Sequence, residues 1–415
     1  MSTPLSYTRS FAFLQGIRSP FFGRLALYLK TKAANTVKVN FTAGDEVFWP
    51  RSLSSVAFRG EHEQLDPFYQ DFFTRHAITD IVLFGDSRII HTTAIAVARQ
   101  MGLRVHVFEE GYFRPYWLTL DSGGVNANSS LPRDPDWYKE VAKFVPRYGN
   151  GQAFKSSFIT RAWHDVAYNL HGLRDRWQYP GYQTHAPYSV WTEYAAYIRR
   201  GWKLRGRTRQ DAQSISHLIR HDQRFYLLAL QLNSDTQIRQ HSGFDSMNDV
   251  IDLVLRSFAE FAPADAILVI KNHPLDPGID DHEGTVAALA RQLGIAERVI
   301  FLESGHLPSL LSHTVGVIVV NSTVGGSALV HAAPTISLGK ALYDLPGLTF
   351  QGDLDAFWRD AEPPDMRLFR NFRNVVIHTT QINGGFYTRS GISMALEGCA
   401  GRLLSDRLPL EMLGR

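Results

Sequence analysis

Two adjacent carboxylates, Glu109 and Glu110, are candidates for covalent or acid-base chemistry in this 415-residue sequence. They end a predicted strand and precede Gly111, and a carboxylate in a partly closed site can act as acid, base or nucleophile. Asp86 follows another predicted strand and is the rival carboxylate, although it could instead cap the next helix. Arg114 could pair with an anionic sugar through its planar guanidinium, or could neutralise Glu109. Two adjacent surface acids can also be merely solvated.

A basic strand end supplies a second set of candidate groups. Lys271 and His273 alternate at the end of a buried strand that Pro274 terminates, so both side chains are expected on the same face. A cation or a donating imidazole beside a phosphate leaving group stabilises the charge that develops as the bond breaks. The alternative for an isolated histidine is a structural role at the strand end.

The segment from Asn321 to Ser327 follows a predicted strand and opens a predicted helix. Its backbone amides and the hydroxyls of Ser322 and Thr323, in a turn that includes Gly325, could hold a phosphate at the positive end of the helix. The alternative is an ordinary hydroxyl cap. The segment lacks the glycine spacing and the lysine of the Walker loop and of the dinucleotide fingerprint, which disfavours kinases and dehydrogenases.

Length and composition narrow the class of protein. A chain of 415 residues, 44% hydrophobic and 20% charged, corresponds to roughly two to three globular domains. The single cysteine excludes an intrachain disulfide and a cysteine-rich metal site, and the histidines show no metal-ligand spacing, so we expect no metal. No apolar run approaches the roughly 18 residues of a membrane span, and the N-terminus lacks a secretory signal, so a cytoplasmic location is expected.

The elements that must position these groups alternate between strand and helix. Such alternation predicts parallel pairing, because a parallel connection must be long enough to hold a helix. The expected strands are 10–14, 36–41, 81–84, 103–108, 225–232, 266–271, 298–302, 315–320 and 335–338. The expected helices are 21–32, 89–101, 247–261, 284–293, 307–312 and one that begins near residue 325.

This order predicts an α/β protein with two Rossmann-like domains. The expected segments are an N-terminal α/β domain (1–134), a helical, basic and aromatic insertion or linker (135–215), a second α/β domain (216–367) and a helical C-terminal tail (368–415). Ligands of such sheets bind outside the carboxyl ends of the strands, and a cleft between lobes is the usual place.

Six long segments carry a resemblance to a known family. In chain order they read FLQGIRSPFFGRLA (13–26), VNFTAGDEVFW (39–49), FEEGYFRPYWLTLDSGGVNANSSLP (108–132), KNHPLDPG (271–278), NSTVGGSALVHAAPTISLGKALYDLPGLTFQGDLDAFW (321–358) and QINGGFY (381–387). They resemble the bacterial capsule polysaccharide biosynthesis and export proteins, most closely the KpsS type. The resemblance covers nearly the whole chain in order, and the region 135–213 is the least diagnostic part.

The resemblance implies a retaining glycosyltransferase of GT-B type. Such an enzyme would transfer 3-deoxy-D-manno-octulosonic acid (Kdo) from CMP-β-Kdo to a lysophosphatidylglycerol acceptor, to start the β-Kdo linker of a capsular polysaccharide. The first domain would take the acceptor, and the second would take the nucleotide sugar. Partners would be the cytoplasmic face of the inner membrane and the capsule assembly and export proteins, with no cofactor required beyond the donor substrate.

The resemblance also implies roles for single residues. Related CMP-sugar transferases carry an acidic-Gly, a His-Pro and a Ser/Thr motif, and the similar residues here are Glu109-Glu110-Gly111, His273-Pro274 and Ser322-Thr323. Retention by a carboxylate suggests double displacement through a covalent sugar intermediate, with Glu110 the first and Asp86 the second choice of nucleophile. Two alternatives stay open: a non-catalytic binding or scaffold component of export, and a sugar-nucleotide epimerase.

A basic run lies in the linker region, with six cations and no acid between residues 199 and 209. We expect it to face an anionic membrane that carries the lipid acceptor. The alternatives are a solvated helix face and, ranked last, a nucleic-acid patch, so no nucleic-acid partner is expected. The predicted membrane-facing residues are Arg199, Arg200, Trp202, Lys203, Arg205, Arg207 and Arg209.

Overall fold

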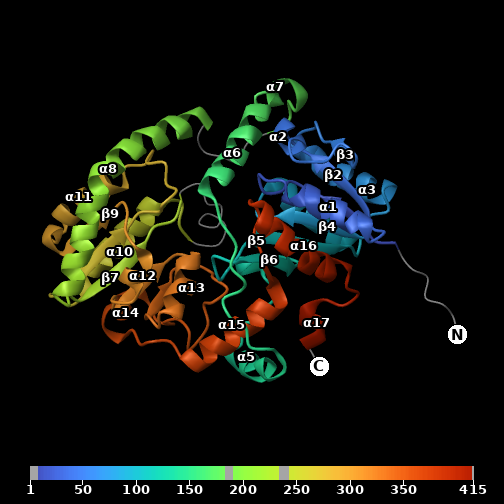
Figure 1. Cartoon of the computed structure of the whole chain (residues 1–415). Helices are drawn as coiled ribbons and strands as arrows, with labels where there is room; N and C mark the ends of the chain where they lie inside the picture. The colour runs from blue at the N-terminus through green and yellow to red at the C-terminus, as the bar shows by residue number, and fades with distance from the viewer. Residues whose placement is uncertain (1–7, 183–189, 233–242, 414–415) are drawn as a thin grey trace. The chain divides into compact units, whose positions relative to one another are not determined.

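A computed structural model describes residues 8–182, 190–232 and 243–413 (Figure 1). The chain divides into two compact units, and we describe each by itself. Unit 1 comprises residues 1–131, 141–185 and 374–415, and unit 2 comprises residues 132–140 and 186–373. Within the described residues, no helix is both long enough and apolar enough to cross a bilayer.

Unit 1 is built on a seven-stranded sheet in the order β12-β6-β5-β4-β1-β2-β3. The strands β1 to β5 pair in parallel, whereas β6 pairs antiparallel with both β5 and β12. Their bounds are β1 Ser10–Phe13, β2 Asn35–Asn40, β3 Ser54–Ala57, β4 Asp80–Phe84, β5 Arg104–Glu110, β6 Trp117–Ser122 and β12 Gln381–Asn383.

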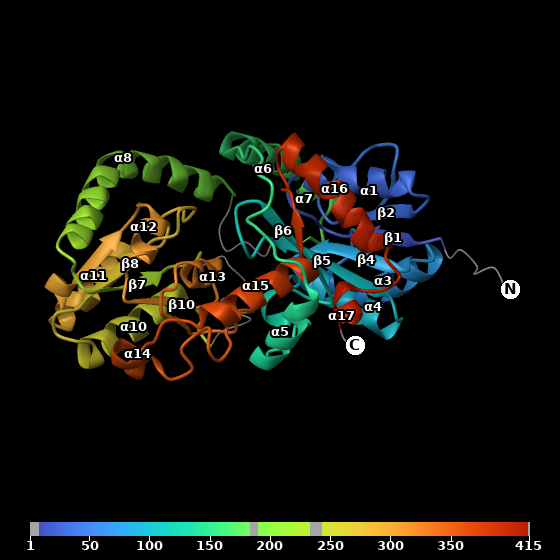
Figure 2. The ribbon, with the colours of Figure 1, turned by 60° about the horizontal axis from the view of Figure 1, so that its bottom comes forward.

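Helices cover both faces of this sheet. Successive strand residues point to opposite sides, so apolar side chains lie on both faces and both faces must be buried. On β5, Phe108 packs into the cluster with helices α1 and α16, and Val107 packs into the cluster with helices α3 and α4. The view in Figure 2 shows these helices about the sheet. The helices of unit 1 are α1 Phe21–Thr31, α2 Ala43–Glu46, α3 Leu65–Arg75, α4 Ile89–Gln100, α6 Phe158–Gly172, α7 Asp175–Gln178, α16 Arg389–Leu404 and α17 Pro409–Leu413, with short 3-10 turns η1 His62–Gln64, η2 Asn126–Asn128 and η3 Ala142–Phe144.

Unit 2 is built on a five-stranded, fully parallel sheet in the order β11-β10-β7-β8-β9. Its strands are β7 Phe225–Ala229, β8 Ile267–Lys271, β9 Val299–Leu302, β10 Gly316–Val319 and β11 Thr335–Ser337. Its helices are α8 Val190–Arg220, α10 Met247–Phe261, α11 His282–Gln292, α12 Leu307–Leu311, α13 Thr323–Val330 and α14 Leu354–Asp360, with the 3-10 turn η4 Ala296–Arg298. Two helices cross the unit boundaries: α5 Pro135–Val141 and α15 Met366–Thr380.

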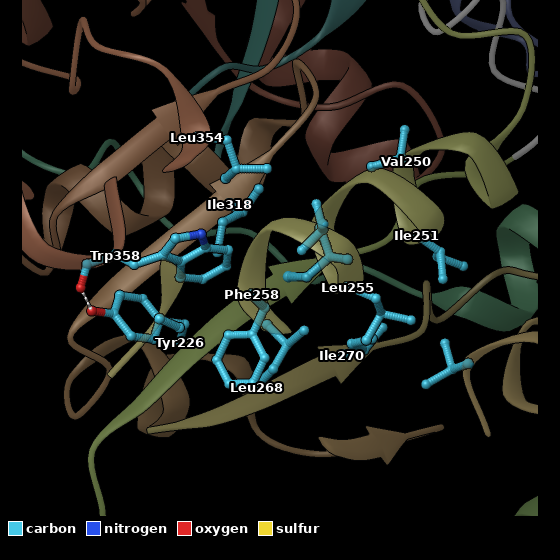
Figure 3. Packing of buried hydrophobic residues seen from close by; sticks show 14 of the residues in the cluster. Tyr226, Val250, Ile251, Leu255, Phe258, Leu268, Ile270, Ile318, Leu354 and Trp358 are labelled. Atoms are coloured by element: carbon cyan, nitrogen blue, oxygen red, sulfur yellow. Dashed lines mark hydrogen bonds between the residues drawn. The ribbon is translucent and has the colours of Figure 1, made fainter. Parts of the chain in front are cut away.

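An aromatic cluster fills one side of the unit 2 sheet (Figure 3). Trp358 of α14 is fully buried, and its ring meets those of Tyr226 and Phe258 edge-on, with centroids 4.9 and 5.3 Å apart. Its indole N–H donates to Ser257 Oγ at 2.8 Å, and the Tyr226 hydroxyl donates to the Trp358 carbonyl oxygen. The cluster therefore joins β7, α10 and α14 by both packing and satisfied polar groups.

Each sheet has a point where its strand order reverses. In unit 2 the chain runs from β7 to β8 and β9, then returns to the other side of β7 for β10 and β11. In unit 1 it runs from β1 to β2 and β3, then returns to the other side of β1 for β4 and β5. Open α/β sheets bind ligands outside the carboxyl ends of the strands beside such a reversal.

The predicted α/β class with two Rossmann-like parts is confirmed, and the structure divides the chain differently from the expected segments. The strands β3, β6 and β12 were not predicted. The C-terminal segment contributes β12 and α16 to unit 1, so it is part of that unit's sheet and core and not a separate tail. The linker region 135–215 is split, with 141–185 in unit 1 and both 135–140 and 186–215 in unit 2.

The aromatic cluster yields a stability prediction. Trp358→Ala should lower the free energy of unfolding by about 3–5 kcal/mol, because it leaves a cavity and removes the indole donor from Ser257 Oγ. Urea unfolding followed by circular dichroism measures the change. Trp202→Ala, at a site 71% exposed in the same unit, is the control and should cost no more than about 0.5 kcal/mol. Equal losses in the two variants would contradict the assignment of Trp358 to the core.

Candidate functional site

The strand reversal in unit 2 is closed by a reciprocal pair of hydrogen bonds. Gln231, which follows β7, donates from Nε2 to Asn321 Oδ1 at 2.9 Å. Asn321, which follows β10, donates from its backbone amide to Gln231 Oε1 at 3.1 Å. Gln231 is buried, so this pair fixes where the Asn321 segment begins. The Ser/Thr segment therefore stands at the strand ends where a ligand is expected.

Ser322 and Thr323 have different roles in this segment. Ser322 is the N-cap of α13, and its Oγ accepts the Val324 amide at 3.2 Å. Its carbonyl oxygen accepts the Tyr343 hydroxyl at 2.6 Å, and a Cβ at position 325 would come within 2.2 Å of that hydroxyl, so only glycine fits there. Within the described residues the Thr323 hydroxyl makes no hydrogen bond. Thr323 is thus the side chain that remains available to an anion.

His273 lies in a loop that follows β8, and the loop fixes its tautomer. The His273 amide donates to Asn272 Oδ1 at 2.8 Å, and the Leu275 amide donates to His273 Nδ1 at 3.1 Å. An Nδ1 that accepts a hydrogen bond carries no proton, so the neutral ring carries its proton on Nε2. His273 is half-buried, and it has the donating imidazole that a phosphate oxygen requires.

Lys271 differs from His273 in its surroundings. The lysine is 6% exposed, and its Nζ donates to the Asn272 carbonyl oxygen at 3.3 Å. Burial, and next the positive charge of Arg200, lower the pKa of Lys271. Lys271 therefore lies within the base of the loop, and of the two predicted groups only His273 is partly exposed.

A single buried guanidinium holds the loop that carries His273 and Pro274. Arg200 of α8 donates to the carbonyl oxygens of His273 and Pro274, each at 3.1 Å, and to that of Asp276. Its Nη2 also pairs with Glu303 Oε2 at 3.1 Å, and both side chains are under 10% exposed. Arg200 is therefore a positioning residue for this loop.

Glu303 makes two further contacts, one with the loop after β8 and one with helix α8. Asn272 donates to Glu303 Oε2 at 3.0 Å, and Lys203 pairs with Glu303 Oε1 at 3.2 Å. Desolvation opposes ionisation of Glu303, but hydrogen bonding and the nearby cations leave its pKa below the usual value. Tyr197 and Arg199 donate to two more loop carbonyls, those of Leu275 and Gly278.

The prediction that the whole basic run of α8 faces a membrane is wrong for Arg200, which is buried. Lys203 and Arg207 both pair with Glu283. The helical repeat places positions 200, 203 and 207 on one side, which faces the acids of unit 2. Trp202, Arg205 and Arg209 are exposed, and Arg199 is exposed with its guanidinium bonded to Gly278.

The buried pair gives a prediction for the loop. Arg200→Met should lower the free energy of unfolding by about 3 kcal/mol, because it leaves the Glu303 carboxylate buried without its guanidinium partner and removes the Arg200 donor from three carbonyl oxygens. Arg205→Met, on the exposed side of α8, is the matched control and should change it by less than about 0.5 kcal/mol. Urea unfolding of the two variants is the measurement. If Arg200→Met lost no more unfolding free energy than the control, the assignment of Arg200 as the residue that holds this loop would be contradicted.

In unit 1 the adjacent acids point to opposite sides of β5. Glu110 shares the face of α1 and α16, and its carboxylate is 27% exposed. Arg161 of α6 lies 3.7 Å from Glu110 Oε1, and the Tyr387 hydroxyl donates to the same oxygen at 3.4 Å. The Arg161 guanidinium also lies over the Tyr387 ring, 4.9 Å from its centroid. Glu110 is thus a partly exposed carboxylate between a cation and a phenol.

Glu109 occupies the other side of the strand end. Its Oε1 accepts the Glu110 amide at 2.9 Å, and its Oε2 lies beside Gly85. The turn after the acids is tight, since a Cβ at Gly111 would stand 2.0 Å from the Trp117 carbonyl oxygen. Glycine is therefore required where the chain leaves β5 for β6.

Asp86 is placed differently from the expectation that it could cap α4. The N-cap of α4 is Arg88, without a side-chain cap. Asp86 instead accepts from the Val125 amide at 2.9 Å and from Asn128 Nδ2 at 3.1 Å. It is 3% exposed, so Glu110 is the more accessible of the two candidate nucleophiles. Arg114 is exposed, and no ion pair joins it to Glu109 in the described part of the chain.

A buried carboxylate that we did not predict lies near Asp86. Asp121 of β6 is 5% exposed and accepts from Ser129 Oγ at 2.6 Å and from the Ser122 amide at 2.7 Å. Burial raises the pKa of Asp121 to about 7, and the charge of Asp86 adds to the rise, while the two hydrogen bonds oppose it. Asp121 is therefore protonated across the mildly acidic range in the folded chain.

The sign of the resulting pH dependence follows from proton binding. From about pH 4 to about pH 7 the unfolded chain has lost this proton while the folded chain keeps it, so Asp121 makes the protein less stable as pH rises. Asp121→Asn should therefore gain stability relative to wild type between these pH values, by up to about 4 kcal/mol. Urea unfolding at both ends of the range measures the difference. Asp406→Asn, at a side chain 99% exposed, is the control, and a pH-independent difference for Asp121→Asn would contradict the prediction.

Four site residues were not predicted from the sequence, namely Arg161, Tyr387, Glu303 and Asp121, and Arg200 was predicted to face a membrane and not to hold the loop. Tyr387 and Asp121 lie inside segments quoted for the family resemblance, and the 200, 203, 207 spacing was visible in the basic run. Arg161 lies in the least diagnostic region, and no local signal marks it. In the described residues, no three His, Cys, Asp or Glu side chains are placed to hold a metal ion.

Comparisons with known proteins agree in the family they indicate. The model of the capsule polysaccharide biosynthesis protein family matches residues 79–387. The capsule polysaccharide export protein KpsS of Escherichia coli is 36% identical over 387 residues, which is 93% of this chain and 98% of the relative. The capsule polysaccharide modification protein LipB of Neisseria meningitidis is 35% identical over 387 residues, 91% of each chain. A solved structure, Thermosulfurimonas dismutans KpsC, beta Kdo 2,7 transferase, aligns with a TM-score of 0.46 and 13% identity over 95% of this chain and 99% of that chain.

Proposed function

Because this chain belongs to the capsule polysaccharide biosynthesis protein family, we propose that it is a retaining glycosyltransferase of GT-B type. Its donor would be CMP-β-Kdo and its acceptor lysophosphatidylglycerol, and its product would begin the β-Kdo linker of a capsular polysaccharide. The choice of donor and acceptor comes from the family resemblance of the acidic-Gly, His-Pro and Ser/Thr segments.

One observation carries the proposal. All three segments stand at the carboxyl ends of parallel strands, where α/β sheets bind ligands: Glu110 ends β5, His273 follows β8, and Thr323 follows β10. The side chains of the two units also suit different parts of the proposed transfer reaction. Unit 2 offers a donating imidazole and a free hydroxyl at the start of a helix, which suit a phosphate, and unit 1 offers a partly exposed carboxylate.

In the first step, a Glu110 carboxylate oxygen attacks the anomeric carbon of Kdo. The bond from that carbon to the phosphate oxygen breaks, and its electron pair leaves on CMP. His273 Nε2–H and the Thr323 hydroxyl donate hydrogen bonds to the departing phosphate, whose charge increases during this step. A Kdo ester of Glu110 results, with inverted configuration at the anomeric carbon.

In the second step, a hydroxyl of the acceptor attacks the anomeric carbon of this ester. The bond to Glu110 breaks, the carboxylate is regenerated, and the second inversion restores the β configuration. The hydroxyl proton passes to the phosphate of CMP. Arg161 stays paired with Glu110 at the start and the end of the cycle, when the carboxylate is free.

A second candidate function is a non-catalytic component that binds the lipid-linked glycan for export. The observation in its favour is the name of the Escherichia coli relative, a capsule polysaccharide export protein. Such a component would tolerate the loss of Glu110 and of His273, whereas a transferase would lose turnover and keep its fold.

The test is Kdo transfer to a fluorescent lysophosphatidylglycerol, with CMP-Kdo generated in place and products detected by mass spectrometry. Wild type should add Kdo, and Glu110→Gln and His273→Ala should each lower turnover by at least about 100-fold, since each removes a group that reacts or stabilises charge. Glu63→Gln and His313→Ala, at exposed sites in the same two units, are the matched controls and should keep activity. Well-folded wild type without product, or full activity in both site variants, would contradict the transferase.

A further inference from the structure

Helix α6 exposes an apolar face that no described part of unit 1 covers. Trp163 is 67% exposed and Ile159 is 80% exposed, although both are large hydrophobic side chains on a regular helix. The exposed hydrophobic residues of α6 and of the turn and helix α7 that follow are Phe158, Ile159, Trp163, Leu170, Leu173 and Trp177. Large exposed apolar side chains gathered on neighbouring turns of a helix are typical of an interaction site.

The opposite side of α6 is the side that packs on unit 1. Arg161 pairs with Glu110, Asp165 pairs with Arg18, and the Tyr168 hydroxyl donates to Asp45 Oδ1. At about 100° per residue, positions 161, 165 and 168 fall together, and positions 159, 163 and 170 fall on the other side. Packing therefore fixes the orientation of the helix, and the apolar face is turned outward.

The charges around this face are those that an anionic lipid surface attracts. The segment from 155 to 178 exposes Lys155, Arg174 and Arg176 beside its apolar residues. Its two acids are engaged elsewhere, Asp165 with Arg18 at 2.5 Å and Asp175 with the Ala43 amide at 2.6 Å. Tryptophan, leucine and phenylalanine flanked by exposed cations are typical of helices that lie in the membrane interface.

We propose that the outward face of α6, continued through Trp177, docks on an anionic membrane. This surface replaces the basic run of α8, several of whose cations are committed to Glu283 and Glu303. The position of α6 also links the membrane to chemistry. Arg161 on its inward side contacts Glu110, and a helix with its side chains is about 10 Å across, so the bilayer would lie about one helix diameter from that carboxylate.

The chain offers a matched pair of variants that separates the two surfaces. Ile159 and Trp163 of α6 are 80% and 67% exposed, and Ile198 and Trp202 of α8 are 66% and 71% exposed, with the same spacing of four residues. Two double variants therefore remove the same pair of side chains, one isoleucine and one tryptophan, from two different helices. They are Ile159→Ser with Trp163→Ser in α6, and Ile198→Ser with Trp202→Ser in α8. Neither pair touches the candidate site residues, and thermal unfolding of both variants should stay at the wild-type temperature.

The experiment is co-sedimentation of the full chain with vesicles of phosphatidylglycerol and phosphatidylcholine. Wild type should bind, the α6 pair should lower the partition coefficient by at least about tenfold, and the α8 pair should change it less than about twofold. A larger effect of the α8 pair, equal effects of both pairs, or no binding of wild type would overturn the proposal. So would an α6 pair that alters the mass of the chain in sedimentation equilibrium without altering vesicle binding, because that result assigns the face to a second copy.

Vesicle binding requires no turnover, so this inference stands apart from the proposed function. If wild type binds vesicles through α6 but adds no Kdo, the transferase proposal fails and the docking proposal stands. If wild type adds Kdo to a dissolved acceptor but does not bind vesicles, the docking proposal fails and the transferase proposal stands.

Discussion

The loop that carries His273 depends on one buried guanidinium. Arg200 donates to the carbonyl oxygens at 273, 274 and 276, which follow the end of β8, and all three would lose this donor if Arg200 were absent. Arg200 can be buried only because Glu303 offsets its charge, and Glu303 is held in turn by Asn272 and Lys203. The position of a candidate catalytic imidazole is therefore set by a helix that precedes it by some seventy residues in the chain.

In unit 1, too, residues distant in sequence determine the surroundings of the candidate group, here Glu110. The strand places this carboxylate at the sheet edge, but its neighbours come from α6 and from the C-terminal segment, through Arg161 and Tyr387. One helix thus serves two purposes: its inward side orders the groups around Glu110, and its outward side presents the apolar face that we assign to a membrane.

Hydrophobic periodicity predicted most strands and helices of both sheets to within a few residues, because parallel strands buried on both faces leave strong apolar runs. The strands that were missed are β3, with its largely exposed residues, and β6 and β12, which pair across more than 250 residues. Residue type also selected Glu110, His273 and the Ser322–Thr323 pair as candidates, and the structure places all of them at strand ends. It could not identify Arg161 or Arg200 as their partners, nor show that Lys271 and Asp86 are buried, because those facts depend on contacts distant in sequence.

The proposed bond between Glu110 and the sugar can be tested by trapping the covalent intermediate. Wild type would be mixed with CMP-Kdo without acceptor, quenched in acid within seconds and digested for peptide mass spectrometry. We expect one Kdo residue on the peptide that contains Glu110, and we expect this label to be lost when lysophosphatidylglycerol is added before the quench. A Kdo residue on the peptide that contains Asp86, or turnover with no labelled peptide at any time, would contradict it.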